Sequence, residues 1–211
     1  MLAIIFRSEK IMCIIALWFI LICSERALSQ TISFSYKGNN RNCIVHLPPS
    51  YSPSVAYPLV FNLHGFGSNS TQQQLYSAMD AVADTAGFIV AYPNAISGQW
   101  DIIFSGSPVD DVGFINTLLD SLIARYHIDT THVYATGMSM GGFMTYRLGC
   151  ELANRLAAIA SVAGPTTDSV LIACDNSRVI PVMHIHGTAD NTVPYAGDTL
   201  FNNVDSTIQY Y

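Results

Sequence analysis

The stretch Gly137-Met138-Ser139-Met140-Gly141 has the residue types and the spacing of a serine-nucleophile motif, G-x-S-x-G. A strand pattern precedes it and a helical pattern follows it. A serine in a sharp strand-to-helix turn exposes its hydroxyl above a sheet, and the flanking glycines let neighbouring backbone approach without a Cβ clash. The motif therefore predicts that Ser139 attacks an acyl carbon. The alternative is an ordinary glycine-rich turn between a strand and a helix.

Acyl transfer also needs hydrogen-bond donors for the oxyanion of the tetrahedral intermediate. One expected donor is the backbone N–H of Met140, the residue after the nucleophile. The second is expected from the loop Leu63-His64-Gly65-Phe66-Gly67, and we assign it to the backbone of Phe66. His64 lies far upstream of the serine, so we interpret it as a residue that orients this loop rather than as the base. His64 and Trp100 are also weaker candidates for substrate contact, with core packing as the alternative for the tryptophan.

The carboxylate that orients the catalytic base is expected after a later strand, in the order Ser, Asp, His. The segment from Val182 to Asp190 has the pattern of a buried strand, a turn and a carboxylate, and Asp190 comes 51 residues after Ser139. Asp198 lies further along the following loop and Asp175 precedes the strand, so both are weaker alternatives. The sequence predicts Asp190 as the acid.

These 211 residues contain no histidine after Asp190. All six histidines precede it, at positions 46, 64, 127, 132, 184 and 186. Without a base a serine hydroxyl is a weak nucleophile at neutral pH, and loss of the triad histidine in subtilisin costs about a million-fold in kcat. We therefore expect this chain to be inactive by itself. His184 and His186 are expected to hydrogen-bond within the sheet or the loop after it.

Strand and helix patterns alternate along the chain, which predicts a single α/β domain with a mostly parallel sheet. The expected strands are 32–36, 42–47, 57–63, 88–92, 131–135, 156–162 and 179–185, the first two being antiparallel. Four helices are expected. The first has a capping box at Ser70 and Gln73 and continues through Leu75, Met79, Val82 and Ala83. The second is capped by Asp110 or Asp111 and buries an apolar stripe of Ile115, Leu118, Leu119, Leu122 and Ile123, and the other two cover 139–152 and 198–211.

The first 29 residues have the pattern of a signal peptide, with the domain proper at 30–211. Arg7 and Lys10 form a basic region, an apolar run follows at 11–23, and small residues near Ser29 predict cleavage before Gln30. A membrane anchor is the alternative, but thirteen helical residues span only about 20 Å of a ~30 Å hydrocarbon core. Translation from Met12 stays open. The protein is thus expected to be extracellular or periplasmic, without a stable membrane anchor.

Composition excludes several function classes. Half of the residues are hydrophobic and 11% are charged, which excludes a disordered chain. Residues 30–211 carry six basic and thirteen acidic side chains, so we expect no nucleic-acid binding. Three cysteines remain in this part, and we favour a Cys150–Cys174 disulfide over three free thiols including Cys43. No cysteine–histidine spacing is typical of zinc, and we expect neither a metal nor a cofactor.

The ordered set of motifs resembles the polyhydroxybutyrate depolymerase and feruloyl esterase group of secreted α/β-hydrolases. The matching stretches are Leu63–Gly67, Ala91–Asn94, Asp110–Ile115, Val133–Gly142, Ala157–Gly164, Pro181–Asp190 and Val193–Tyr195. The resemblance implies an α/β-hydrolase fold with helices on both faces of the sheet, here lacking its C-terminal strand and helix. It also implies a serine and an aspartate at Ser139 and Asp190, and a histidine in a further C-terminal stretch.

Members of that group hydrolyse polyhydroxyalkanoates, feruloyl or acetyl esters of plant polysaccharide, or small aryl esters. The leading hypothesis is therefore a carboxylic-ester hydrolase, a serine esterase of polysaccharide degradation or polyester breakdown. Two alternatives stay open. One is a catalytically silent protein that binds esters or carbohydrate, and the other is a peptidase, since the same fold and triad also cleave amides.

Overall fold

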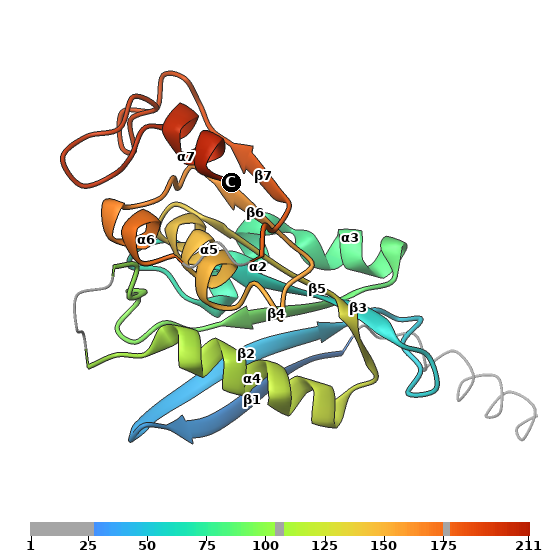
Figure 1. The fold of residues 1–211 in the computed structure, drawn as a ribbon. Coiled ribbons are helices and arrows are strands. Elements are labelled where there is room, and N and C mark those ends of the chain that lie inside the picture. Colours follow the sequence, from blue (N-terminus) through green and yellow to red (C-terminus); the bar gives the residue numbers. More distant parts are fainter. Residues whose placement is uncertain (1–27, 104–107, 175–177) are drawn as a thin grey trace, which may run out of the picture.

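The chain forms a seven-stranded sheet within the residues that the structure, a computed structural model, describes: 28–211 except 104–107 and 175–177 (Figure 1). The strands are β1 (Leu28–Tyr36), β2 (Asn39–Leu47), β3 (Tyr57–Leu63), β4 (Ile89–Pro93), β5 (Ile128–Met138), β6 (Ala158–Val162) and β7 (Val182–Ile185). Their order across the sheet is β1-β2-β4-β3-β5-β6-β7. β1 pairs antiparallel with β2 and β2 with β4, whereas all later pairs are parallel. The predicted mostly parallel α/β sheet is confirmed.

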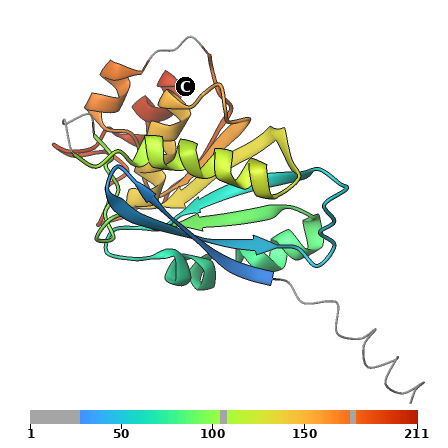
Figure 2. The ribbon, with the colours of Figure 1, turned by 90° about the horizontal axis from the view of Figure 1, so that it is seen from below.

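Helices cover both faces of this sheet. One face carries α2 (Ser70–Ser77) and α3 (Met79–Ala86), and the opposite face carries α4 (Asp111–Arg125), α5 (Met140–Glu151) and α6 (Asp168–Ala173) (Figure 2). The last helix, α7 (Val204–Tyr210), is tied to the segment around α6, because the Thr207 and Thr166 hydroxyls lie 3.2 Å apart and the Tyr210 hydroxyl donates to the Leu171 carbonyl.

The core lies between the central strands and α4. Leu59, Phe61 and Leu63 of β3 are fully buried, as the compact apolar run of this strand predicts. α4 begins where its sequence indicates: the Asp110 carboxylate accepts from the Gly113 N–H at 2.8 Å, which satisfies a free donor of the first turn. Four of the five residues of its predicted apolar stripe are buried, and Ile123 packs against the core.

The prediction of one helix that continues from Ser70 through Ala83 is wrong. The chain breaks at Ala78, whose φ of 49° lies in the left-handed region, and two short helices result. Leu75 and Val82, expected in one buried stripe, are both exposed. The predicted capping box is also wrong, since Asn69 is the N-cap and accepts from the Gln72 N–H at 3.0 Å.

The helix expected over 198–211 is shorter than predicted. The Asp198 carboxylate accepts from the Leu200 and Phe201 N–H groups, at 2.7 and 3.0 Å, and so forms a turn instead of a first helical turn. Helix α7 begins six residues later, at Val204, with Asn203 as its cap. Local side-chain bonding by aspartate therefore takes precedence over the apolar spacing of this segment.

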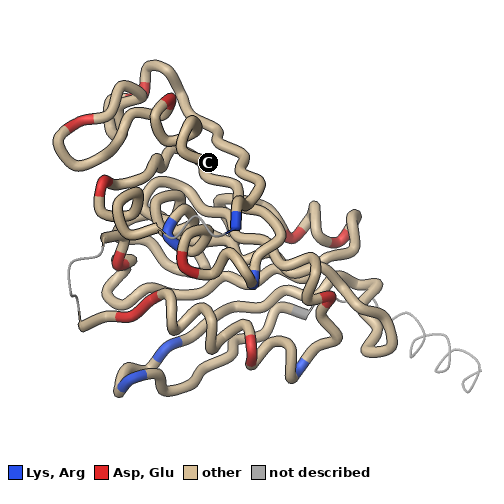
Figure 3. Tube along the Cα trace, in the orientation of Figure 1, with Lys and Arg blue, Asp and Glu red and all other residues tan. Residues whose placement is uncertain are grey.

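A disulfide joins Cys150 at the end of α5 to Cys174 after α6, the pairing favoured from the sequence, and Cys43 is a buried free thiol. The expected signal peptide lies almost wholly outside the described residues, although β1 begins at Leu28, two residues before the expected cleavage point. Acidic side chains outnumber basic ones along the described chain (Figure 3). Two of the basic ones, Arg41 and Arg147, are buried in ion pairs.

Candidate active site

Ser139 stands alone in the turn between β5 and α5. Its φ of 54° and ψ of −122° are a strained combination for a residue with a Cβ. The turn is fixed on both sides: the Ser139 N–H donates to the Val162 carbonyl at 2.8 Å, and its carbonyl accepts from Gly142 N–H at 2.7 Å and Phe143 N–H at 3.1 Å. The strand–turn–helix context that the motif requires is thus present.

The glycines around this turn lie where backbone segments touch. A Cβ on Gly137 would collide with the Gly141 backbone, and a Cβ on Gly141 would collide with the carbonyl oxygens of Leu63 and His64. A Cβ on Gly65 would lie 3.6 Å from the Ser139 Cβ. The loop after β3 is therefore packed directly against the serine turn, as the sequence predicts for a second oxyanion donor.

This loop is held from beneath by His64. The His64 ring is fully buried, its Nδ1 lies 2.7 Å from the Gly65 carbonyl oxygen, and its Nε2 accepts from the Ala95 N–H at 3.1 Å. Burial lowers the pKa of His64. Because Nε2 accepts from a backbone N–H, the proton of the ring lies on Nδ1, which faces the Gly65 carbonyl oxygen. Both ring nitrogens are thus engaged by backbone, an arrangement that matches a loop-orienting role.

Trp100 closes the other side of the same loop. Its indole N–H donates to the His64 carbonyl at 2.8 Å, and its ring centre lies 5.0 Å from that of His64. Only 2% of the tryptophan is exposed. A stacking role for Trp100 on substrate stays a prediction, and its burial favours the packing alternative.

The backbone N–H groups of Met140, which follows Ser139, and of Phe66, which follows Gly65, donate no hydrogen bond to the described residues. Met140 is the first residue of α5, and Phe66 lies in the turn of the 63–67 loop with 65% of its surface exposed. A pocket of about 390 Å³ opens next to Met140 and is lined also by Gln99, Trp100 and Asp101.

A buried network of charged side chains supports one wall of this pocket, and it was not predicted from the sequence. Arg41 on β2 donates to the Asp111 carboxylate at 2.6 Å, and the other oxygen of Asp111 accepts from the Asp101 N–H at 2.8 Å. Arg147 of α5 lies 2.9 Å from the Asp101 carboxylate. The partners are separated by up to 70 residues, so no local pattern in the sequence could reveal the network.

Asp190 follows β7 and lies in a polar turn. One carboxylate oxygen accepts from the N–H groups of Thr192 and Val193, at 2.8 and 3.0 Å, and these bonds lower the pKa of Asp190. The parallel register aligns Met138 with Val162 and Val162 with Ile185. Ser139 and Asp190 therefore follow strands that end at the same edge of the sheet, with β6 between them.

The weaker acid candidates differ in position. Asp198 is occupied in its own turn, as described above. Asp175 lies outside the described residues.

No histidine bridges Ser139 and Asp190 among the described residues. His186 comes nearest to the acid, with its Nε2 3.8 Å from the Asp190 carboxylate, but that nitrogen lies closer to the Val193 carbonyl oxygen, at 2.8 Å. His46 of β2 pairs with Asp84 of α3, and His132 pairs with Asp129 on the surface. Ser139 and Asp190 thus follow strands that end at the same edge of the sheet, and no histidine among the described residues lies between them.

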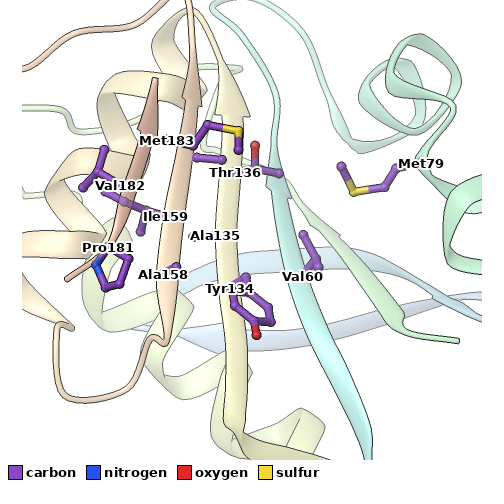
Figure 4. A pocket seen from close by; sticks show the side chains of 11 residues that line it. Val60, Met79, Tyr134, Ala135, Thr136, Ala158, Ile159, Pro181, Val182 and Met183 are labelled. Carbon is purple, nitrogen blue, oxygen red and sulfur yellow. The ribbon is translucent and has the colours of Figure 1, made fainter. Parts of the chain in front are cut away.

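A larger hollow lies elsewhere. It has a volume of about 480 Å³ and an apolar lining from the middle of four parallel strands, with Val60, Tyr134, Ile159 and Val182 among its residues (Figure 4). Met79 of α3 borders it on the side of the α2–α3 face. This hollow is part of the open sheet face and is lined by neither Ser139 nor Asp190. Within the described residues no three-residue cluster could hold a metal ion, and no helix has the length and apolarity to cross a bilayer.

Comparisons with known proteins agree with this geometry. A phospholipase/carboxylesterase family model matches residues 110–209. The chain is 34% identical over 161 residues to a bifunctional acetylxylan esterase/xylanase of Neocallimastix patriciarum, a match that covers 75% of this chain and 23% of that protein. It is 30% identical over 166 residues to a probable feruloyl esterase C of Aspergillus clavatus, covering 75% and 58%.

Among solved structures, a thermostable esterase superposes with a TM-score of 0.66 at 22% identity and covers 83% of this chain and 50% of its own. The chain thus spans between about a quarter and three fifths of the length of these relatives. The chain has the α/β-hydrolase fold and is similar in sequence to a feruloyl esterase and an acetylxylan esterase.

Proposed function

We propose that these residues carry the nucleophile, the oxyanion hole and the acid of a serine carboxylic-ester hydrolase. The observation that carries the proposal is the strained, glycine-packed turn at Ser139, against which the loop containing Phe66 is packed. The esterase relatives support the reaction class. Their names also favour feruloyl or acetyl esters of plant polysaccharide as substrates over polyhydroxyalkanoates.

In the proposed reaction the Ser139 Oγ attacks the ester carbonyl carbon while a base removes its proton. The resulting oxyanion lies against the Met140 and Phe66 N–H groups, which are aimed there before the reaction starts. The intermediate collapses, the alcohol leaves with the proton, and an acyl-serine remains. Water then attacks the acyl-serine, and the acid is released.

The base is the part of the triad that the described residues do not supply. Asp190 is proposed to orient a histidine from sequence outside these 211 residues, because all six present are placed elsewhere or precede the acid. We therefore expect the 211-residue chain to hydrolyse p-nitrophenyl acetate near the background rate. Imidazole in solution, acting in place of the missing side chain, should raise hydrolysis above the sum of its own rate and that of the protein.

The test compares Ser139→Ala with Ser121→Ala, a control that removes a hydroxyl bonded only within α4. The imidazole-dependent gain should disappear in Ser139→Ala and persist in Ser121→Ala. A gain that survives Ser139→Ala would show that another group is the nucleophile. Cleavage of a p-nitroanilide at a comparable rate would favour a peptidase, and no gain with any variant would favour a silent binding protein.

Secretion is a second part of the proposal, and it rests on the basic region and apolar run before Gln30. N-terminal sequencing of protein recovered from the culture medium tests it. A mature chain that begins at Gln30 is expected, and a chain that keeps its first residues would contradict a cleaved signal peptide.

A further inference from the structure

Two histidines that the proposed triad does not use form a continuous series of hydrogen bonds. The Tyr146 hydroxyl lies 2.9 Å from His184 Nδ1, His184 Nε2 lies 3.1 Å from His186 Nδ1, and His186 Nε2 lies 2.8 Å from the Val193 carbonyl oxygen. The two imidazole planes differ by only 14° with their centres 5.3 Å apart. Since most of that separation is spanned by the N–N contact, the rings lie end to end.

The direction of every bond in this series follows from its last member. A carbonyl oxygen only accepts, so His186 Nε2 carries a proton and donates to Val193. The Nδ1 of a neutral His186 then has no proton and must accept from His184 Nε2–H. By the same reasoning His184 Nδ1 accepts, and the Tyr146 hydroxyl donates to it. One carbonyl group thus fixes two tautomers and the orientation of one hydroxyl.

The series is largely enclosed by protein. Tyr146 is fully buried, and 1% of the His186 side chain is exposed. Burial and the neighbouring His186 lower the pKa of His184 to about 4. The other titratable groups that face the series are Asp190, 3.8 Å from His186 Nε2, and two tyrosines: Tyr195, whose ring packs edge-on against His186, and Tyr211, which packs on Tyr146.

The two ends of the series are attached to the two halves of the candidate active site. Tyr146 lies on α5, seven residues after Ser139 and on the same rigid helix. Val193, at the other end, uses its own N–H to bind the Asp190 carboxylate at 3.0 Å. The only other bond to that carboxylate oxygen among the described residues comes from the neighbouring Thr192 N–H.

We propose that Tyr146, His184 and His186 are positioning residues whose one-directional hydrogen-bond series fixes the Asp190 turn relative to the helix of Ser139. The inference rests on the proposed role of Asp190 as the acid, but the hydrogen bonds of the series can be tested without measuring ester hydrolysis. The H-x-H spacing at the end of β7 fits this arrangement, because residues two apart along an extended chain lie on one side and can meet end to end.

The direct test is the tautomeric state of both histidines, read from ¹⁵N chemical shifts in a long-range ¹H–¹⁵N spectrum at pH 7.5. His184 and His186 should each carry their proton on Nε2 alone. A proton on Nδ1 of either ring would overturn the proposal. This measurement needs no substitution and no hydrolysis, so it fails or succeeds independently of the esterase assignment.

The positioning role is tested by amide hydrogen exchange in Tyr146→Phe, with Tyr210→Phe as the matched control. Tyr146→Phe removes the first donor and keeps the ring, so the Thr192 and Val193 amides should exchange about fivefold faster, as expected for loss of one hydrogen bond. Tyr210→Phe removes a hydroxyl that binds the Leu171 carbonyl instead and should leave both rates unchanged. Equal rates in the unsubstituted protein and in Tyr146→Phe would contradict the positioning role even if the tautomers are as deduced.

Discussion

The serine side and the acid side of the candidate site are held by different means. Around Ser139 the backbone itself is packed: Gly137 of β5 lies against Gly141 of α5, and Gly141 lies against the carbonyls of Leu63 and His64. The apolar side chains of β3 beneath this turn are fully buried. Asp190 instead follows the edge strand β7, where Met183 is 60% and Ile185 54% exposed. Its turn is tied to the rest by polar groups, through Val193 and the two histidines.

The difference indicates how each side responds to change. A site made of close backbone contacts has no room for an added atom, because protein interiors are packed like organic crystals. A site held by a series of hydrogen bonds tolerates changes of volume but depends on protonation. Substitutions that enlarge a small residue should therefore destabilise the serine side more than the acid side. A change of pH should affect the acid side more than the serine side.

The largest expected effect is on the serine side. Gly141→Ala places a Cβ against the carbonyl oxygens of Leu63 and His64, and overpacking of this kind costs roughly 1–3 kcal/mol or prevents folding. Gly187→Ala on the acid side is the matched control, since a Cβ there meets nothing within 4 Å. It should change the free energy of unfolding by less than about 0.5 kcal/mol. Urea unfolding of the two variants measures the contrast, and equal losses would remove the proposed difference between the sides.

A smaller effect, of the opposite kind, is expected from pH on the acid side. The pKa of His184 is about 4 in the folded protein, below the 6.5 of a free histidine, so folding favours the neutral ring. The unfolded chain takes up this proton first as the pH falls. Stability from this group is therefore present above pH 6.5, falls between pH 6.5 and 4, and is lost below pH 4.

Comparison with His184→Gln isolates that contribution. His64, whose pKa is also lowered by burial, is present in both proteins, so it contributes equally to both profiles. The difference in unfolding free energy between the two proteins should shrink as the pH falls from 6.5 to 4. A difference that is constant over this interval would mean that His184 is not kept neutral by the fold.

The same contrast explains how much could be predicted from the sequence. The serine side follows local rules: a buried strand, a G-x-S-x-G turn and a helix are adjacent in the chain, and the structure has each of them. The parallel sheet follows from alternating apolar runs for the same reason. The break at Ala78 had no such signal, because the left-handed conformation of an alanine is imposed by its tertiary surroundings rather than by its own preference.

The supports of the site could not be predicted from one sequence. Arg41 and Asp111 are 70 residues apart, and Tyr146 and His184 are 38 apart. Each of these side chains has many possible partners in the chain, and only the order of strands in the sheet selects one. Local pattern therefore locates the proposed nucleophile, whereas the groups that position it and the proposed acid depend on the assembled fold.

The assignment of Ser139 as nucleophile is tested most directly by covalent labelling. The protein is incubated with a fluorophosphonate in the presence of imidazole and digested with trypsin, which releases residues 126–147 as one peptide with Ser139 as its only serine. We expect a single phosphonyl adduct on that peptide and none in Ser139→Ala. An adduct on another peptide that persists in Ser139→Ala would contradict the account.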